Sequence, residues 1–146
     1  MMVRAPMPAD RARWEDLYAG YAGFYNVPQT PGMRATVWGW INDPTCEVQG
    51  LLAVDSTGLA VGLAHFRAFR RPLSASTGGF LDDLFVDPAA RGSGAAQALI
   101  AAVQAEGRLR GWTVIRWITA PGNARARSVY DQVAVATPWV TYDITL

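Results

Sequence analysis

The glycine-rich turn at residues 91–96, Arg-Gly-Ser-Gly-Ala-Ala, constrains the fold more than any other stretch of this chain. It follows residues 80–86, which are predicted to form a strand, and it opens an alanine-rich segment, 94–110, with the apolar spacing of a helix. A second apolar strand is expected at 113–118. Because a strand, a helix and a further strand form a right-handed crossover, we expect the two strands to lie parallel and close together.

The rest of the chain supplies further helices and strands around this crossover. Strands are expected at 3–5, at 47–55 and 59–69 as a hairpin, and at 139–146, and helices at 11–25, 36–41 and 123–133. Asp10 is the expected N-cap of the first helix. The predicted order is β-α-α-β-β-β-α-β-α-β. It predicts an α/β fold whose central sheet is mixed and mostly antiparallel, with helices on both faces.

Length and charge restrict the classes of protein to which the chain can belong. Its 146 residues fit one domain, 1–146, that needs no disulfide or metal to stabilise its core. A net charge of +1 predicts no nucleic-acid partner and no anionic membrane partner. With one cysteine, Cys46, and one histidine, His65, no metal site is expected. A single cysteine suits a reducing compartment, so a cytoplasmic protein is expected, and no segment resembles a signal peptide or a membrane span.

The glycine turn has the chemistry of an anion site. Gly92 and Gly94 can adopt positive φ, and the first N–H groups of the following helix have no partner within it. The helix dipole adds partial positive charge there, which suits a diphosphate. Ser93 could add a hydroxyl and Arg91 a cation. The alternative is an ordinary strand-to-helix turn, since the turn has neither the Lys-Ser/Thr of a P-loop nor the spacing of a dinucleotide fingerprint.

Two signatures in this chain resemble those of the GNAT superfamily, the GCN5-related N-acetyltransferases. Residues 91–96 match the pattern Arg/Gln-x-x-Gly-x-Gly/Ala. Residues 123–134, "NARARSVYDQVA", are similar to the second signature, Asn-x-x-Ala-x-x-φ-Tyr, with Asn123, Ala126, Val129 and Tyr130 at the matching positions. Ala134-Val135 departs from the usual Gly-Phe. The order of the predicted elements extends the resemblance over the whole chain.

The resemblance implies that the cofactor is acetyl-CoA. Its pyrophosphate would be bound by the backbone amides of Arg91, Gly92, Ser93, Gly94, Ala95 and Ala96. Its pantetheine arm would pair as an extra strand with backbone groups of Leu84, Phe85 and Val86. Asn123 would contact the pantetheine or the adenine end. Tyr130 would protonate or hydrogen-bond the departing thiolate, although a packed tyrosine with a wet hydroxyl is the alternative.

The acidic pair in the strand 80–86 indicates where the amine that accepts the acetyl group would bind. By simple alternation, Asp82 shares a face with Leu84 and Val86, whereas Asp83 lies on the opposite face. "FLDDLFV" also resembles a stretch of the diamine and polyamine acetyltransferases within the superfamily. There the acids bind the cationic amine and help to deprotonate it, which implies a catalytic role for Asp82, through water, and a substrate-binding role for Asp83. The alternative is an ion pair with Arg67.

Aromatic residues of the two early helices could complete an amine site through cation–π contact. The candidates are Trp38, Trp40, Tyr21 and Tyr25, of which Trp38 and Tyr25 are the predicted substrate-binding residues, with core packing as the alternative. His65 is expected to be a packed, hydrogen-bonded histidine, although a second general base is the other reading. Arg125 and Arg127 would either meet the 3′-phosphate of CoA or lie in solvent.

These expectations combine into an N-acetyltransferase that transfers an acetyl group from acetyl-CoA to a primary amine, by direct attack in a ternary complex. The expected partner is a small-molecule amine, polyamine-like or otherwise, and a protein or peptide amine is the second choice. A non-catalytic acyl-CoA-binding regulatory domain and a CoA-independent interaction module are the alternatives from other classes. The apolar closing strand and Trp139 are compatible with a homodimer.

Overall fold

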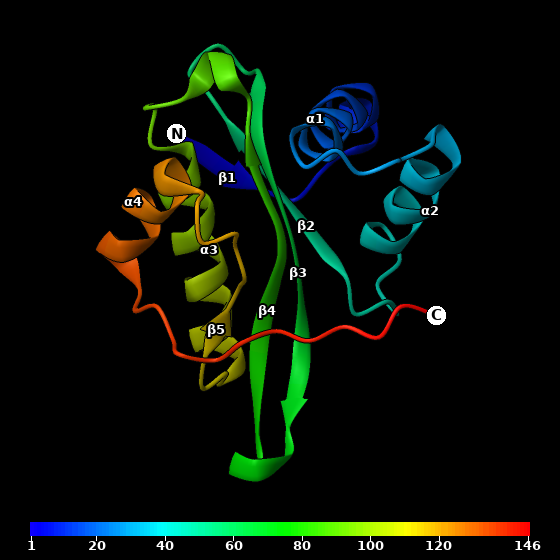
Figure 1. The fold of residues 1–146 in the computed structure, drawn as a ribbon. Helices are drawn as coiled ribbons and strands as arrows, with labels where there is room; N and C mark the ends of the chain where they lie inside the picture. Colours follow the sequence, from blue (N-terminus) through cyan, green and yellow to red (C-terminus); the bar gives the residue numbers. More distant parts are fainter.

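The computed structural model describes all residues, 1–146, and centres on a five-stranded sheet in the order β1-β2-β3-β4-β5. The strands are β1 (Met2–Arg4), β2 (Gln49–Val54), β3 (Ala60–Arg71), β4 (Ser76–Val86) and β5 (Ile115–Arg116). The first four pair antiparallel, and β5 pairs parallel with β4 at Gly79 and Phe80. The mixed, mostly antiparallel sheet and its parallel crossover are therefore confirmed (Figure 1).

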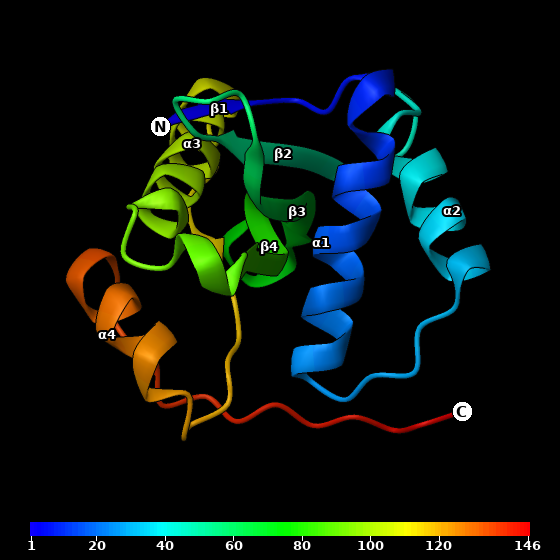
Figure 2. The same ribbon diagram turned by 90° about the horizontal axis from the view of Figure 1, so that it is seen from above.

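Helices cover both faces of this sheet, as expected. Seen from above, α1 (Arg11–Phe24) and α2 (Pro31–Ile41) lie on one side of the strands, and α3 (Ala95–Arg110) and α4 (Ala124–Val133) lie on the other (Figure 2). None of the helices has the length and apolar content that a membrane crossing requires.

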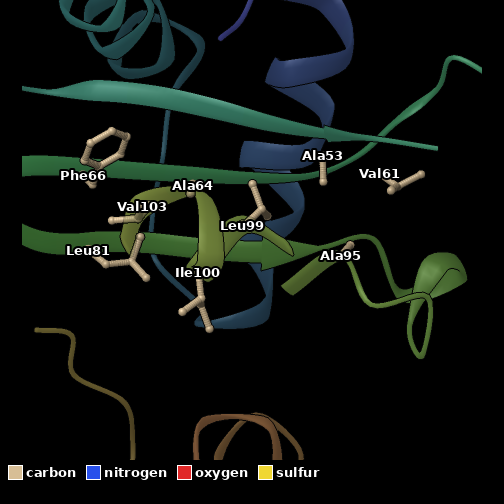
Figure 3. Close-up of a cluster of buried hydrophobic side chains, with 9 residues drawn as sticks. All are labelled: Ala53, Val61, Ala64, Phe66, Leu81, Ala95, Leu99, Ile100 and Val103. Carbon is tan, nitrogen blue, oxygen red and sulfur yellow. The ribbon is translucent and has the colours of Figure 1, made fainter. Parts of the chain in front are cut away.

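Each face of the sheet has its own buried cluster, because neighbouring residues of a strand point to opposite faces. On the α3 face, side chains of β2, β3 and β4 pack against Ala95, Leu99, Ile100 and Val103 of α3 (Figure 3). On the α1 face, a second cluster comprises Trp14, Leu17, Leu52, Val54, Ala60 and Leu63. Burial on both faces explains why β2 and β3 have apolar runs rather than a clean apolar–polar alternation.

The structure differs from the predicted elements in three places. Residues 134–146 form no strand, so the predicted closing strand at 139–146 is wrong: its apolar alternation is present, but no strand of the sheet pairs with it. The second helix begins at Pro31 rather than at 36, because Thr30 caps it by accepting a hydrogen bond from the Met33 N–H at 3.2 Å. Asp10 does not cap α1 through its side chain and instead pairs with Arg4 at 2.7 Å.

A β-bulge in β4 changes the faces of the acidic pair. His65 of β3 lies opposite Asp83, but the next residue, Phe66, lies opposite Leu81, so Asp82 is an extra residue. Leu81 and Leu84 consequently both pack on the α3 face. Asp83 accepts a hydrogen bond from the Tyr18 hydroxyl of α1. Asp82 accepts a hydrogen bond from Arg67, which lies on the same α1 face of β3 as His65. The predicted sharing of one face by Asp82 and Leu84 is therefore wrong, because simple alternation does not anticipate the bulge.

Candidate active site

A cavity of about 390 Å³ opens where the C-terminal end of β4 meets the start of α3. Its walls are the last three residues of β4, the glycine turn and first turn of α3, the inner side of α4, and the end of α1. Elements distant in sequence, α1 and α4, therefore face each other across it. The cavity is lined more by apolar than by polar residues, as ligand sites commonly are.

One wall of the cavity is an unpaired strand edge. β5 pairs with β4 only at Gly79 and Phe80, so no strand of the sheet flanks residues 81–86 on the side away from β3. Leu84, Phe85 and Val86 line the cavity along this stretch. Their backbone edge is accessible to a ligand that offers alternating hydrogen-bond donors and acceptors, as an added strand does.

The glycine turn brings bare backbone to the cavity. Gly92 and Gly94 have φ of 78° and 85°, in the left-handed region that favours glycine. No atom lies within 4 Å of an added Cβ at either position, so backbone conformation rather than space requires these glycines. Gly94 is the N-cap of α3 and offers no side-chain acceptor. The first amides of α3 are therefore free to bind an anion at the cavity.

Asp87 holds the start of this turn in place. Its carboxylate accepts a hydrogen bond from the Ala89 N–H at 2.9 Å and pairs with Arg13 of α1 at 2.7 Å. The hydrogen bond from Arg13 is the main reason why the pKa of Asp87 lies below its usual range. The turn is thus attached to α1 on the opposite face of the sheet, which fixes its position relative to β4.

α4 contributes Tyr130 and the residue that precedes the helix, Asn123, to the cavity. The Tyr130 ring packs against Trp117, with centroids 5.4 Å apart, and burial raises the pKa of its phenol to about 12. Tyr130 is therefore protonated at neutral pH and can donate a hydrogen bond. The Asn123 amide donates to Thr119 at 3.3 Å and to the Tyr25 hydroxyl at 3.4 Å, which links α4 to α1.

Behind the cavity lies a buried polar network that joins α1, β3 and β4. Trp14 donates its indole N–H to His65 Nε2 at 3.0 Å, and His65 Nδ1 lies 2.8 Å from the Asp83 carboxylate. Because the indole can only donate, Nε2 must accept, so the proton is on Nδ1 and is donated to Asp83. Tyr18 donates to the same carboxylate oxygen at 2.9 Å. His65 is 1% exposed with both nitrogens occupied, which confirms a packed, hydrogen-bonded histidine.

Tyr21 connects this network to the cavity. Its ring contacts those of Tyr18, Tyr25 and Phe85, with centroid distances of 6.2, 5.1 and 5.9 Å, and it lines the cavity. Burial, and after it the negative charge of Asp83, raises the pKa of Tyr21. Tyr18, Tyr21 and Tyr25 are spaced as one helix face, which is the sequence signal that could have identified them together.

The structure brings most of the predicted site residues together and leaves some apart. The cavity is lined by the predicted residues Tyr25, Leu84, Phe85, Val86, Arg91, Gly92, Gly94, Ala95, Ala96, Asn123 and Tyr130. It is also lined by Phe24, which sequence reasoning missed, and by Arg125. Ser93, Asp82, Asp83 and Trp38 do not line it.

Two of the residues outside the cavity have other partners. Asp82 forms an ion pair with Arg67 at 3.1 Å, and burial raises the pKa of its carboxyl although Arg67 opposes this shift. Trp38 packs on Trp14 with centroids 5.1 Å apart. Asp83 differs from both, because its negative charge acts on Tyr21, a cavity residue whose ring packs on Phe85.

An unpaired strand edge beside an open helix start, within this mixed sheet, can bind a ligand that carries both a strand-like arm and an anionic group, as the acyltransferases that use a CoA thioester require. The chain matches the model of the Acetyltransferase (GNAT) family over residues 14–134. It therefore belongs to the GNAT family and is an acetyl-CoA-dependent N-acetyltransferase.

A curated relative agrees with the family, and solved structures agree with the fold. The chain is 32% identical over 143 residues to the D-amino-acid N-acetyltransferase HPA3 of Saccharomyces cerevisiae, covering 97% of this chain and 89% of that protein. Among solved structures, the ribosomal-protein-alanine N-acetyltransferase of Brucella melitensis matches with a TM-score of 0.81 at 23% identity, covering 100% of both chains. AAC(6')-Iy, in complex with the bisubstrate analogue CoA-S-monomethyl-acetylneamine, matches with a TM-score of 0.84 at 21% identity, covering 99% and 97%.

Proposed function

We propose that the protein acetylates the amine of a small molecule of amino-acid size, by direct attack in a ternary complex. One observation carries this proposal: a single cavity runs from the open start of α3 along the free edge of β4 to the tyrosines of α1. A cofactor and a small acceptor can therefore meet inside it. The similarity to HPA3, whose name assigns it D-amino acids, supports a small amine.

The residues present fit acetyl-CoA. The free amides at Gly94, Ala95 and Ala96 would hold the pyrophosphate, with Arg91 and Arg125 supplying positive charge at the same cavity. The free edge at Leu84–Val86 would pair with the pantetheine arm, and Asn123 would contact it from α4. When bound, acetyl-CoA supplies the thioester carbonyl that the amine attacks and the thiolate that departs.

On the acceptor side, Asp83 would attract the ammonium form of the substrate and take up its proton through Tyr21 or a water molecule. Hydrogen bonds from His65 and Tyr18 orient the carboxylate from behind. Tyr130, on the opposite wall, would donate to the departing thiolate. A polyamine-type site would require two available carboxylates, whereas Asp82 is paired with Arg67. This favours an acceptor with one ammonium group near Asp83.

Gly94→Ala is expected to weaken CoA binding by about tenfold or more, because a Cβ disfavours the positive φ that aims the first amides of α3 at the cavity. The matched control is Gly111→Ala. Gly111 ends the same helix with a φ of 72°, and it too has no atom within 4 Å of an added Cβ. Isothermal titration with CoA should show the loss of affinity for Gly94→Ala alone. Equal affinities in both variants would contradict an anion site at this turn.

Asp83→Asn is expected to lower kcat/KM for the amine by about 10- to 100-fold and to leave the KM for acetyl-CoA within about twofold. An amide keeps the shape of the side chain but removes the charge that attracts ammonium. Asp82→Asn is the matched control, with an expected change of less than about threefold, because Asp82 is engaged with Arg67 outside the cavity. Initial rates of CoA release measure both. A larger loss in Asp82→Asn would instead support the catalytic role that the sequence assigns to Asp82.

A further inference from the structure

A second cavity, of about 350 Å³, lies beside the start of β4, whereas the active-site cavity lies at the end of this strand. It is formed by the end of β3, the turn that joins β3 to β4, and Arg116 of β5. In Figure 1 this hairpin extends past α1 and α2 at the bottom of the view. Ser76 begins β4 and Leu84 lines the active-site cavity. At roughly 3.3 Å per residue, the two residues are about 25 Å apart along the strand.

Three arginines line this second cavity, and none of them has a carboxylate partner. Arg70, Arg71 and Arg116 take part in no ion pair of the structure. The two stretches of chain that form this end of the sheet, 56–81 and 107–130, contain no aspartate or glutamate. Positive charge is therefore concentrated here without compensation, although the net charge of the whole chain is only +1.

Neighbouring hydroxyls and an aromatic ring hold the three arginines in place. Arg71 donates a hydrogen bond from Nη1 to Thr113 Oγ1 at 2.7 Å, and a threonine hydroxyl of β4 holds Arg70 in the same way. The Arg116 guanidinium lies over the Phe69 ring, 5.5 Å from its centroid. A guanidinium carries five N–H donors in a fixed planar arrangement. Each of the three side chains therefore keeps free donors for a ligand in the cavity.

The number of positive charges favours a phosphate group over a carboxylate. A phosphate monoester carries a charge of about −1.5 to −2 at pH 7 and offers three strong acceptor oxygens. Arginine side chains bind such a group through two parallel hydrogen bonds each. A carboxylate offers one charge and two oxygens, so it would leave part of the three guanidinium groups without a partner.

The size and lining of the cavity suit a small molecule rather than a polymer. Its volume lies within the range of about 300–1,000 Å³ that is typical of small-molecule sites. Phe69 and Leu73 add apolar surface beside the arginines. The Leu73 side chain is fully exposed, so an apolar group attached to the phosphate would remove it from water.

We propose that this cavity is a second ligand site, which binds a small phosphorylated molecule that carries an apolar or aromatic group. Arg71 and Arg116, which are half-buried, bind the phosphate, and the exposed Arg70 adds positive charge at the rim. Leu73 contacts the apolar group. The site is separate from the one that holds acetyl-CoA, so both ligands can be bound at once.

Isothermal titration with phenyl phosphate tests the site, with saturating CoA present so that the active-site cavity is occupied. A dissociation constant below about 1 mM is expected, and the double variant Arg71→Gln, Arg116→Gln should raise it by about 30-fold or more. The matched control is Arg108→Gln, which removes an exposed arginine that does not line the cavity. No binding to the full chain at about 10 mM, or equal affinities in the double variant and the control, would overturn the proposal.

The choice of ligand tests the chemistry of the site. Benzoate has the same ring with a single charge, and it is expected to bind about tenfold or more weakly than phenyl phosphate. Phenyl phosphate should itself bind more weakly at about pH 5 than at about pH 7.5, since its second ionisation lies near pH 6 and the arginines stay charged. Equal binding of benzoate would overturn the assignment to phosphate. Tighter binding of a single-stranded oligonucleotide at the same arginines would overturn a small-molecule site.

NMR of the arginine side chains locates the ligand in the full chain and does not depend on the stability of the double variant. The Nε–Hε signals of Arg71 and Arg116 are identified by their loss in Arg71→Lys and Arg116→Lys. Both signals should shift when phenyl phosphate is added to the CoA-bound protein. Shifts confined to Arg91 and Arg125 would place the phosphate in the active-site cavity and overturn the second site.

Discussion

Tyr130→Phe is expected to lower kcat by about 100-fold, while the dissociation constant of CoA changes by less than about twofold. Phenylalanine keeps the packing against Trp117 and removes only the hydroxyl that would donate to the departing thiolate. Burial raises the pKa of Tyr130 to about 12, above the usual value of 10, so the phenol stays protonated below pH 10. The ratio of the kcat values of the two proteins should therefore be constant between about pH 7 and pH 9.

The matched control is Tyr25→Phe, which removes a second tyrosine hydroxyl from the same cavity. That hydroxyl accepts a long hydrogen bond of 3.4 Å from Asn123, so a loss of less than about fivefold in kcat is expected. Steady-state kinetics and CoA titration of both variants separate catalysis from binding. If Tyr130→Phe kept most of its kcat, Tyr130 would be a packing residue and the thiolate would need another donor.

Trp14→Ala is expected to lower the free energy of unfolding by about 3–5 kcal/mol, the largest effect on stability that we expect from one substitution. Trp14 is fully buried and its ring contacts Tyr18, Trp38 and His65. The substitution leaves a cavity at the centre of the α1 face and removes the donor to His65. Urea denaturation followed by circular dichroism measures the change.

Two further variants separate packing from hydrogen bonding in this effect. Trp14→Phe retains an aromatic ring but leaves His65 Nε2 without its donor, so a loss of about 1–3 kcal/mol is expected. Trp40→Ala is the control, because Trp40 is 48% exposed on α2, and a change of less than about 1 kcal/mol is expected. Equal losses in Trp14→Ala and Trp40→Ala would contradict a buried network at Trp14.

Much of the fold could be predicted because its signals are local. The turn Ser56-Thr57-Gly58 lies between β2 and β3 of the hairpin, and the glycine turn marks the crossover from β4 to α3. The start of α2 was missed although Thr30-Pro31 carried a local cap signal. The closing strand was wrong for another reason, since a strand needs a partner edge and the apolar period of 139–146 does not specify one.

In the candidate site, too, some residues could be predicted from local sequence signals, whereas others depend on the tertiary fold. Residues of the two signatures, such as Gly94 and Tyr130, could be predicted to lie together. The first signature follows the strand expected at 80–86 and the second follows the strand expected at 113–118, and these two strands are expected to lie parallel and close together. The network of Trp14, His65 and Asp83 could not be predicted, since it joins three elements that only the tertiary fold brings into contact. The bulge at Asp82 removes that carboxylate from the face of Leu84 and places it beside Arg67, and it depends on the register of β3 with β4.

The most direct test of the central proposal is a thiol-release assay with acetyl-CoA and a panel of acceptors: D- and L-amino acids, spermidine and a lysine-containing peptide. We predict CoA release that depends on the amine, with kcat/KM for the best amino-acid-sized acceptor about tenfold or more above that for the peptide and for spermidine. Mass spectrometry of the product should show one acetyl group on the amine. Acetylation of the peptide alone, or no CoA release with any acceptor on the panel, would contradict a small-amine acetyltransferase.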